Sequence, residues 1–176
     1  MKTRVVELRN VSAAEAWLRK YPERTVLAVS ADSKGRPNMI ALGWNMPASS
    51  RPPMAAISVN HRSLSHKLIH EGGEFVLVFP SREMEGVVMY CGTHSGRNVD
   101  KFKETGLTPV KAKHVKPPLV AEAVVNMECR VVGELLTGDH TIFVGEILAA
   151  YVSEEPRKVL FNLGPDEKGR RVFGGF

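Results

Sequence analysis

The sequence predicts a single-domain, mainly β protein: an antiparallel barrel with a few short helices inserted between its strands. Two long β-patterned runs, 122–136 and 141–152, are separated only by the turn Thr137-Gly138-Asp139-His140. Two shorter runs, 25–31 and 39–45, are joined by a turn that contains glycine. Strands connected this closely pair in antiparallel fashion. No regular strand–helix alternation, which a parallel sheet requires, runs along the chain.

The first predicted element is a helix over residues 12–21. Ser12 and Glu15 have capping-box spacing, so that the hydroxyl and the carboxylate can each accept a hydrogen bond from a backbone N–H group at the start of the helix. Pro22 follows and is expected to end the helix.

Three strands are predicted next. The runs 25–31 and 39–45 flank a turn at 32–37, where Asp, Gly and Pro supply turn chemistry. Residues 47–53, PASSRPP, are predicted to form a loop, and 54–60 a third strand.

Helices alternate briefly with one strand in the middle of the chain. A short helix is predicted over 63–70, and the run 74–80, EFVLVFP, is apolar enough for a strand buried on both faces. Two further helices are predicted over 82–90 and 99–105, the second ended by Gly106.

The last third begins with a proline-containing loop over 107–118 and continues into the two long runs. Gly133 and Gly145 interrupt those runs and predict bulges or sharp bends. Residues 153–176 are predicted to be a C-terminal extension of a single domain spanning 1–176, and the basic excess over 156–176 is typical of a solvated tail.

The amino-acid composition limits the classes of protein to which this chain can belong. A chain of 176 residues with 43% hydrophobic residues is long enough to bury its own core. The net charge of +5 favours anionic partners such as phosphate-bearing cofactors without requiring nucleic acid. Two cysteines do not make a disulfide framework, and no apolar run is long enough to cross a membrane. We therefore expect a cytoplasmic protein with no membrane contact.

Residues 62–65 form the first donor-rich segment. They lie where a predicted strand ends and a helix begins, and helix N-termini bind phosphate well. Arg62 offers a planar guanidinium to phosphate oxygens, and Ser63 and Ser65 offer hydroxyl groups. An N-terminal serine cap beside a solvated arginine is the alternative interpretation.

The second donor-rich segment precedes the helix predicted over 99–105. Gly92 and Gly96 allow close backbone approach, and Ser95, Arg97 and Lys101 supply donors and charge. The alternative is an ordinary polar loop. The hypothesis of a shared phosphate site fails if 62–65 and 95–101 lie on opposite sides of the molecule.

Several chemistries have no support. The sequence lacks a dinucleotide-binding G-x-G-x-x-G, a P-loop, an H-E-x-x-H and a G-x-S-x-G motif. The Cys91-x-x-His94 spacing resembles half of a zinc site that Cys129 or His140 would have to complete, but a buried cysteine beside a polar loop explains it better. We predict no metal site and no catalytic side chain. His140 starts a strand where it can face a cleft, and Trp44 is predicted to be a core residue.

Taken together, the motifs resemble the flavin reductase-like family of FMN-binding split β-barrels, and the flavoredoxins within it. The matching segments, in unbroken order, are Gly35-Arg36-Pro37-Asn38, Gly43-Trp44, Arg62-Ser63-x-Ser65, Gly73-Glu74-Phe75-Val76, Cys91-Gly92-x-x-Ser95-Gly96-Arg97-x-x-Asp100-Lys101-Phe102, Glu128-Cys129 and Gly138-Asp139-His140-x-x-Phe143-Val144-Gly145-Glu146.

This resemblance implies a homodimer with one FMN per subunit near the dimer interface. The phosphate would meet the 62–65 and 95–101 segments, the strand around 38–45 would lie along the flavin ring, and Lys101 or His140 would stabilise the reduced ring. The implied cofactor-binding residues are Asn38, Gly43, Trp44, Asn45, Arg62, Ser63, Ser65, Ser95, Gly96, Arg97, Lys101, His140 and Phe173.

The implied function is an FMN-dependent oxidoreductase that uses NAD(P)H to reduce free flavin, a ferric complex or a redox protein. One alternative is a flavoredoxin-like electron carrier without its own nicotinamide-dependent turnover. A third hypothesis, from another class, is a basic barrel that binds nucleic acid, although aromatic residues make up only 7% of the chain.

Overall fold

The computed structural model describes residues 8–175, and the ends of the predicted domain, 1–7 and 176, lie outside them. The elements, in chain order, are α1 (Ala13–Trp17), β1 (Glu23–Arg24), β2 (Val26–Ala31), β3 (Pro37–Leu42), β4 (Asn45–Ser50), β5 (Pro53–Asn60), α2 (Leu64–Gly72), β6 (Glu74–Phe79), the 3₁₀ turn η1 (Arg82–Met84), α3 (Glu85–Thr93), α4 (Lys101–Thr105), β7 (Pro109–Val110), β8 (Leu119–Val120), β9 (Val125–Thr137), β10 (His140–Val152), β11 (Leu160–Pro165) and β12 (Arg171–Gly175). The prediction of a mainly antiparallel β fold with short helices is confirmed.

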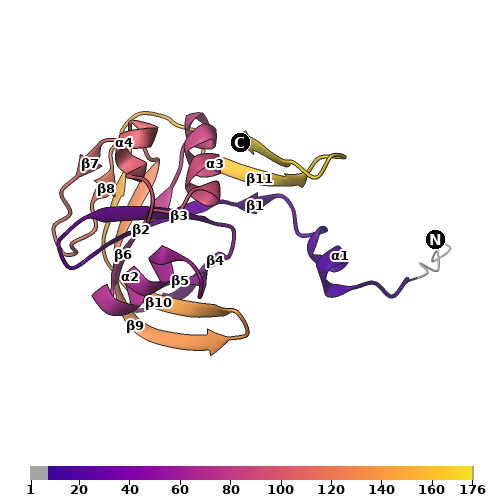
Figure 1. The fold of residues 1–176 in the computed structure, drawn as a ribbon, viewed down its shortest axis with the longest axis horizontal. Helices are drawn as coiled ribbons and strands as arrows, with labels where there is room; N and C mark the ends of the chain where they lie inside the picture. The colour runs from indigo at the N-terminus through magenta and orange to yellow at the C-terminus, as the bar shows by residue number, and fades with distance from the viewer. Residues whose placement is uncertain (1–7, 176) are drawn as a thin grey trace.

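One seven-stranded sheet forms the body of the protein, in the order β3-β2-β6-β9-β10-β5-β4, and every neighbouring pair is antiparallel. The two end strands, β3 and β4, are not paired with each other, so the barrel is split. Figure 1 shows the β2–β3 hairpin running between α2 on one side and α3 with α4 on the other. The open end of the barrel at β3 is therefore where three helices meet the sheet.

The central strands are buried on both faces, as predicted for 74–80. Along β2, Val26 and Ala28 belong to one apolar cluster, while Leu27 and Val29 belong to another. Successive side chains of a strand point to opposite faces, so one strand serves two cores. The first cluster fills the barrel around Phe75 and Phe143, and the second packs against α3, α4 and the loop after α4.

The two glycines inside the long strands lie at an irregularity, as predicted. The β9–β10 pairing shifts between Val144 and Gly145, opposite Gly133. A Cβ atom on Gly145 would lie 2.7 Å from a ring carbon of Phe75 and 2.9 Å from the Cβ of Cys129. The bulge thus forms where only a residue without a side chain fits over the barrel core.

Two predicted coil regions are strands instead. Residues 47–53 were predicted to be a loop, but β4 covers most of them and pairs with β5. β4 is an edge strand with only one neighbour, so a proline, which has no N–H group to donate, is tolerated there. The predicted solvated tail also forms structure: β11 and β12 make a hairpin that pairs with β1 and buries Leu160.

The helices are shorter or shifted relative to prediction. Ser12 accepts a hydrogen bond from Glu15 N, as the capping pattern predicted, but α1 ends at Trp17 rather than at residue 21. The helix expected over 82–90 begins as a 3₁₀ turn and extends to Thr93. Within residues 8–175, no helix combines the length and the apolar character that crossing a membrane would require.

A buried carboxylate holds the loop between β7 and β8. Glu128 on β9 is 0% exposed and accepts hydrogen bonds from Lys113 N (2.9 Å), His114 N (2.5 Å), Val115 N (3.1 Å) and the Tyr151 hydroxyl (2.7 Å). Burial by itself raises the pKa of this carboxyl, but these hydrogen bonds outweigh that effect and hold the pKa below its usual value. The loop backbone is thereby fixed from inside the protein.

Candidate functional site

The two donor-rich segments line one cavity of about 350 Å³, called the inner cavity below. Its wall consists of residues 62–65 and 91–97 together with Asn38, Ile40 and Lys101. The Arg97 guanidinium also donates a hydrogen bond to the Arg62 carbonyl oxygen at 3.3 Å, which joins the segments directly. The 62–65 and 95–101 segments therefore do not lie on opposite sides of the molecule, as the hypothesis of a shared phosphate site requires.

The start of α2 is built to open onto this cavity. Ser63 caps the helix, because its hydroxyl accepts a hydrogen bond from His66 N at 3.0 Å and donates one to the Asn60 carbonyl at 2.9 Å. The Arg62 side chain is left exposed at the cavity wall. The capping role and the cavity-lining role expected as alternatives thus coexist in one segment.

Asn38 carries an unused acceptor beside the cavity. This residue is only 4% exposed, and its amide nitrogen donates to the Ser65 hydroxyl at 2.7 Å. Its Oδ1 atom has no hydrogen-bond partner among the described residues. A Cβ atom on Gly96 would lie 2.0 Å from that oxygen, so only glycine at position 96 leaves room for it. A buried orphan acceptor costs free energy unless a ligand or water satisfies it.

Lys101 also lines the inner cavity, but its ammonium group is already engaged. The side chain is buried, and Nζ donates to the Met39 carbonyl at 2.6 Å and the Cys91 carbonyl at 2.8 Å. Burial lowers the pKa of this ammonium group. Two of its three protons thus tie α4 to β3 and to α3, a structural role that the sequence did not indicate.

A second cavity of about 330 Å³, here named the tryptophan cavity, contains Gly43, Trp44 and His140. The rings of Trp44 and His140 lie 4.8 Å apart, and Trp44 is 48% exposed. The prediction of a core tryptophan is therefore wrong, because the chain leaves β3 at Gly43 and turns the indole outward. The His140 Nδ1 atom lies 2.6 Å from Asp139 Oδ1, and this hydrogen bond lowers the pKa of Asp139.

Two residues implied by the resemblance lie outside both cavities. The Asn45 amide donates to the backbone carbonyls of Arg24 and Gly43, which fixes the corner between β3 and β4. Phe173 is 7% exposed and packs in the core cluster with α3 and α4, because β12 turns this side chain inward. Within this chain, the structure does not bring Phe173 to the candidate site.

The Cys91-x-x-His94 pair is not part of a larger cluster of metal-ligating side chains among the described residues. Between residues 8 and 175, no three His, Cys, Asp or Glu side chains gather in a way that would hold a metal ion. The His94 ring stacks on Tyr90 at 3.9 Å. Burial raises the pKa of Cys91 to about 11 and that of Cys129 to about 12, so both thiols stay protonated at neutral pH.

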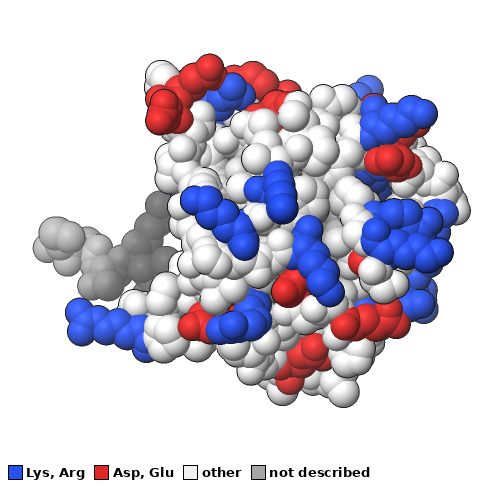
Figure 2. Space-filling model, turned by 90° about the vertical axis from the view of Figure 1, so that its left-hand side faces the viewer, with Lys and Arg blue, Asp and Glu red and all other residues white. Residues whose placement is uncertain are grey.

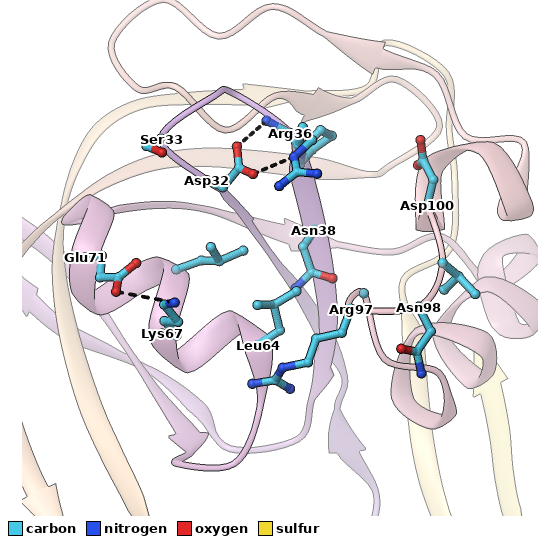
Figure 3. Close-up of a pocket in the computed structure, with 14 residues that line it drawn as sticks. Asp32, Ser33, Arg36, Asn38, Leu64, Lys67, Glu71, Arg97, Asn98 and Asp100 are labelled. Atoms are coloured by element: carbon cyan, nitrogen blue, oxygen red, sulfur yellow. Dashed lines mark hydrogen bonds and ion pairs between the residues drawn. The ribbon is translucent and has the colours of Figure 1, made fainter.

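A third cavity, of about 680 Å³, was not foreseen from the sequence. This outer cavity lies between the β2–β3 turn, α2 and residues 96–100 (Figure 3). It shares Asn38, Leu64, Gly96 and Arg97 with the inner cavity. Asp32 looks like an ordinary turn residue in the sequence, and Arg36 belongs to a matching segment that gave no sign of a cavity.

Comparisons of this chain with known proteins identify the family to which it belongs. A protein of uncharacterised function from Archaeoglobus fulgidus is 44% identical over 128 residues, covering 73% of this chain and 71% of its own length. A ferric-chelate reductase (NAD(P)H) from the same organism is 30% identical over 129 residues, 72% of this chain and 75% of that protein. The solved structure of flavoredoxin from Methanosarcina acetivorans has a TM-score of 0.80 and 31% identity, covering 97% of this chain and 93% of that one. The model of the flavin reductase like domain matches residues 18–164. The chain belongs to the flavin reductase-like family, and its fold is similar to that of flavoredoxin, a member of that family.

Proposed function

We propose that this protein is an FMN-dependent oxidoreductase that uses NAD(P)H to reduce free flavin or a ferric complex. The observation that carries the proposal is the inner cavity, where residues 62–65 and 91–97 converge beside the unpartnered Asn38 oxygen. The cavity has a helix N-terminus, two arginines and hydroxyl groups, which is the donor set that a phosphate needs.

The residues present fit such a cofactor. Arg62 and Arg97 would hold its phosphate, with the Ser95 hydroxyl nearby as a donor. The Asn38 Oδ1 atom would accept a hydrogen bond from the hydroxyl-bearing chain of the cofactor. We further propose that Trp44 and His140 lie by the flavin ring. When bound, the flavin supplies the hydride and electron chemistry, so no protein nucleophile is needed.

Nicotinamide dependence is proposed because a relative bears the name ferric-chelate reductase (NAD(P)H). The alternative, an electron carrier, has support from the similarity to flavoredoxin. Steady oxidation of NADH or NADPH by the FMN-loaded protein with added FMN would favour the reductase. Reduction by a partner protein without nicotinamide turnover would favour the carrier.

On the face that Figure 2 shows, the charge distribution favours a small anionic ligand over a polynucleotide. Figure 2 shows Lys and Arg side chains across one face, with Asp and Glu side chains between them and along its edges. A nucleic-acid-binding barrel is expected to present a continuous basic track with exposed aromatic rings. The mixed charge on this face supports the flavin proposal.

Phosphate recognition is tested by comparing FMN with riboflavin, which lacks the phosphate. We expect Arg62→Ala to weaken FMN binding about 10- to 100-fold, because charge-assisted hydrogen bonds contribute about 1.5–3 kcal/mol. Riboflavin affinity should stay unchanged, as measured by quenching of flavin fluorescence on flavin-stripped protein. Arg51→Ala, an exposed arginine outside the three cavities, is the matched control. Equal weakening of both flavins by Arg62→Ala would refute the role.

We also propose a homodimer in the cytoplasm. Leu135 and Leu136 at the end of β9 are 61% and 77% exposed. Neighbouring strand residues point to opposite faces, so both faces of this hairpin end are bare, which suits a covering subunit. Free, buried Cys91 and Cys129 suit a reducing compartment.

Light scattering should give twice the mass of the chain. Changing Leu135 and Leu136 together to glutamate should give monomers, because two charges cannot be buried unpaired in an interface. Val152→Glu, at an equally bare position (70% exposed) on the far end of β10, is the control. A parent protein that is monomeric at micromolar concentration would contradict the proposal.

A further inference from the structure

Two histidines on either side of the donor-rich segment 62–65 meet the same hydroxyl group. His61 comes directly before the segment, and His66 comes directly after it, in the first turn of α2. The Nε2 atom of His61 lies 3.1 Å from Thr141 Oγ1, and the Nε2 atom of His66 lies 2.8 Å from the same oxygen. Thr141 is on β10 and is only 1% exposed. One buried side chain of the sheet therefore fastens both ends of the segment.

These contacts determine where the segment lies relative to the inner cavity. Arg62 lines that cavity, whereas Thr141 and the two histidines do not. A backbone hydrogen bond from His61 N to the Asp139 carbonyl oxygen, 3.0 Å long, also joins the start of the segment to the end of the β9–β10 hairpin. The side-chain contact of His66 with Thr141 joins its other end to the same hairpin. Thr141 can therefore act on a bound phosphate only indirectly, through the position of Arg62.

The hydroxyl group can satisfy both rings only while at least one of them is neutral. A threonine hydroxyl has one hydrogen to donate, and a neutral imidazole has one donor and one acceptor nitrogen. The hydroxyl therefore donates to one ring and accepts from the other, which leaves room for one extra proton on the pair. When both rings are cationic, the hydroxyl hydrogen loses its acceptor, and two positive charges face each other with ring centroids 5.0 Å apart. A second proton therefore breaks the arrangement.

The groups around the pair determine when that second proton arrives. On α2 and β9, His66 faces His70 and Glu134, and these two are themselves 2.8 Å apart. At the end of the hairpin, His61 faces Asp139. Burial lowers the pKa of His66 below its usual value of 6.5, the neighbouring histidines lower it further, and Glu134 offsets this only in part. The pair is thus intact at neutral pH, and its second proton arrives in mild acid.

We propose that Thr141, together with His61 and His66, positions residues 62–65 for the cofactor phosphate, and that protonation of both histidines releases the segment. The inference rests on the proposed flavin function and deepens it, because it makes the retention of FMN depend on pH. FMN should be held firmly at neutral pH and more weakly in mild acid. Direct attraction between the cationic rings and the phosphate would have the opposite sign, so the direction of the effect separates the two accounts.

The test is the FMN affinity of flavin-stripped protein at about pH 7.5 and about pH 5, on either side of the usual histidine pKa, measured by flavin fluorescence. The FMN phosphate itself takes up a proton at about pH 6, so each protein is compared by the ratio of its two affinities. We expect this ratio to be about fivefold larger for the parent than for His66→Gln, which corresponds to one hydrogen bond of ordinary strength. Glutamine can hydrogen-bond to the hydroxyl group but takes up no proton. His114→Gln, in the exposed loop between β7 and β8, is the matched control and should keep the parent ratio.

Variants of Thr141 test the hydroxyl group itself. Thr141→Val keeps the shape of the side chain but removes both hydrogen bonds. We expect it to lower FMN affinity about five- to tenfold at neutral pH, to leave riboflavin affinity unchanged, and to show the small ratio of His66→Gln. Thr141→Ser restores the hydroxyl group and should recover the parent affinity and the parent ratio, which a purely steric role of Thr141 would not predict.

The outcomes separate this proposal from the flavin function. Equal affinity ratios in the parent, His66→Gln and Thr141→Val would overturn the proposal and leave the flavin function intact. A smaller ratio in the parent than in His66→Gln would also overturn it, because the cationic rings would then attract the phosphate directly. Failure of the parent to bind FMN at either pH would overturn both.

Discussion

Gly96→Ala is expected to lower FMN affinity at least 100-fold. The added methyl group would lie 2.0 Å from Asn38 Oδ1 and 2.7 Å from its Cγ, closer than atoms can approach. The Asn38 side chain must then swing away and give up its 2.7 Å hydrogen bond to the Ser65 hydroxyl. The cavity loses its free acceptor and part of its volume together. Fluorescence titration with FMN measures the loss.

The same loop supplies the control for this variant. Gly92 also lines the inner cavity, but a Cβ atom there would meet only ordinary contacts, the nearest at 3.6 Å from the Ala41 Cβ. Gly92→Ala should therefore bind FMN as the parent does. Adding Asn38→Ala to Gly96→Ala should recover stability, because the clash is gone, but not affinity. A Gly96→Ala protein that binds FMN normally would show that the Asn38 oxygen plays no part in the site.

Glu128→Gln is expected to destabilise the fold by about 3 kcal/mol, since breaking a buried, hydrogen-bonded carboxylate is among the costliest single changes. The amide would turn N–H groups toward backbone donors that now point at carboxylate oxygens. For a domain of this size the melting temperature should fall by roughly 6–12 °C. Glu122→Gln, at a partly exposed carboxylate that accepts from Thr108 N, should cost much less. Equal losses would mean that burial of Glu128 carries no special cost.

The same residue predicts a pH dependence. Hydrogen bonding holds the pKa of folded Glu128 below the ordinary value of 4.5 in spite of its burial. The stability it contributes is therefore fully present above about pH 4.5 and is lost as the pH falls through the folded pKa. Denaturant unfolding at several pH values should show a steeper acid loss in the parent than in Glu128→Gln. Parallel pH profiles would contradict this account.

Local patterns in the sequence were enough to predict the strands that position the site. The apolar runs 25–31 and 74–80 predicted β2 and β6, and the turn at 137–140 predicted the long β9–β10 hairpin. Period and turn chemistry act over a few residues, so one chain segment contains all the information they need. The order of the weak motifs along the chain also predicted the family correctly.

Three predictions from the local sequence were wrong, because the tertiary structure outweighed the local preference. PASSRPP has loop composition, yet it pairs as the edge strand β4, where proline costs little. The basic C-terminal stretch pairs as a hairpin because β1 offers it a partner more than a hundred residues earlier in the chain. Trp44 is apolar enough for a core, but it lies just beyond the end of β3 and remains half exposed.

The antiparallel fold, the family and the two donor-rich segments could be predicted from the residues alone, because they depend on spacing and order along the chain. How the two segments work together depends on contacts that form in the folded molecule. Asn38 meets Ser65 across 27 residues, and Lys101 meets the Met39 carbonyl across 62. Such contacts depend on how the barrel closes and on which atoms become buried. The local sequence therefore does not predict the unpartnered Asn38 oxygen, the hydrogen-bonded Lys101 ammonium group or the outer cavity.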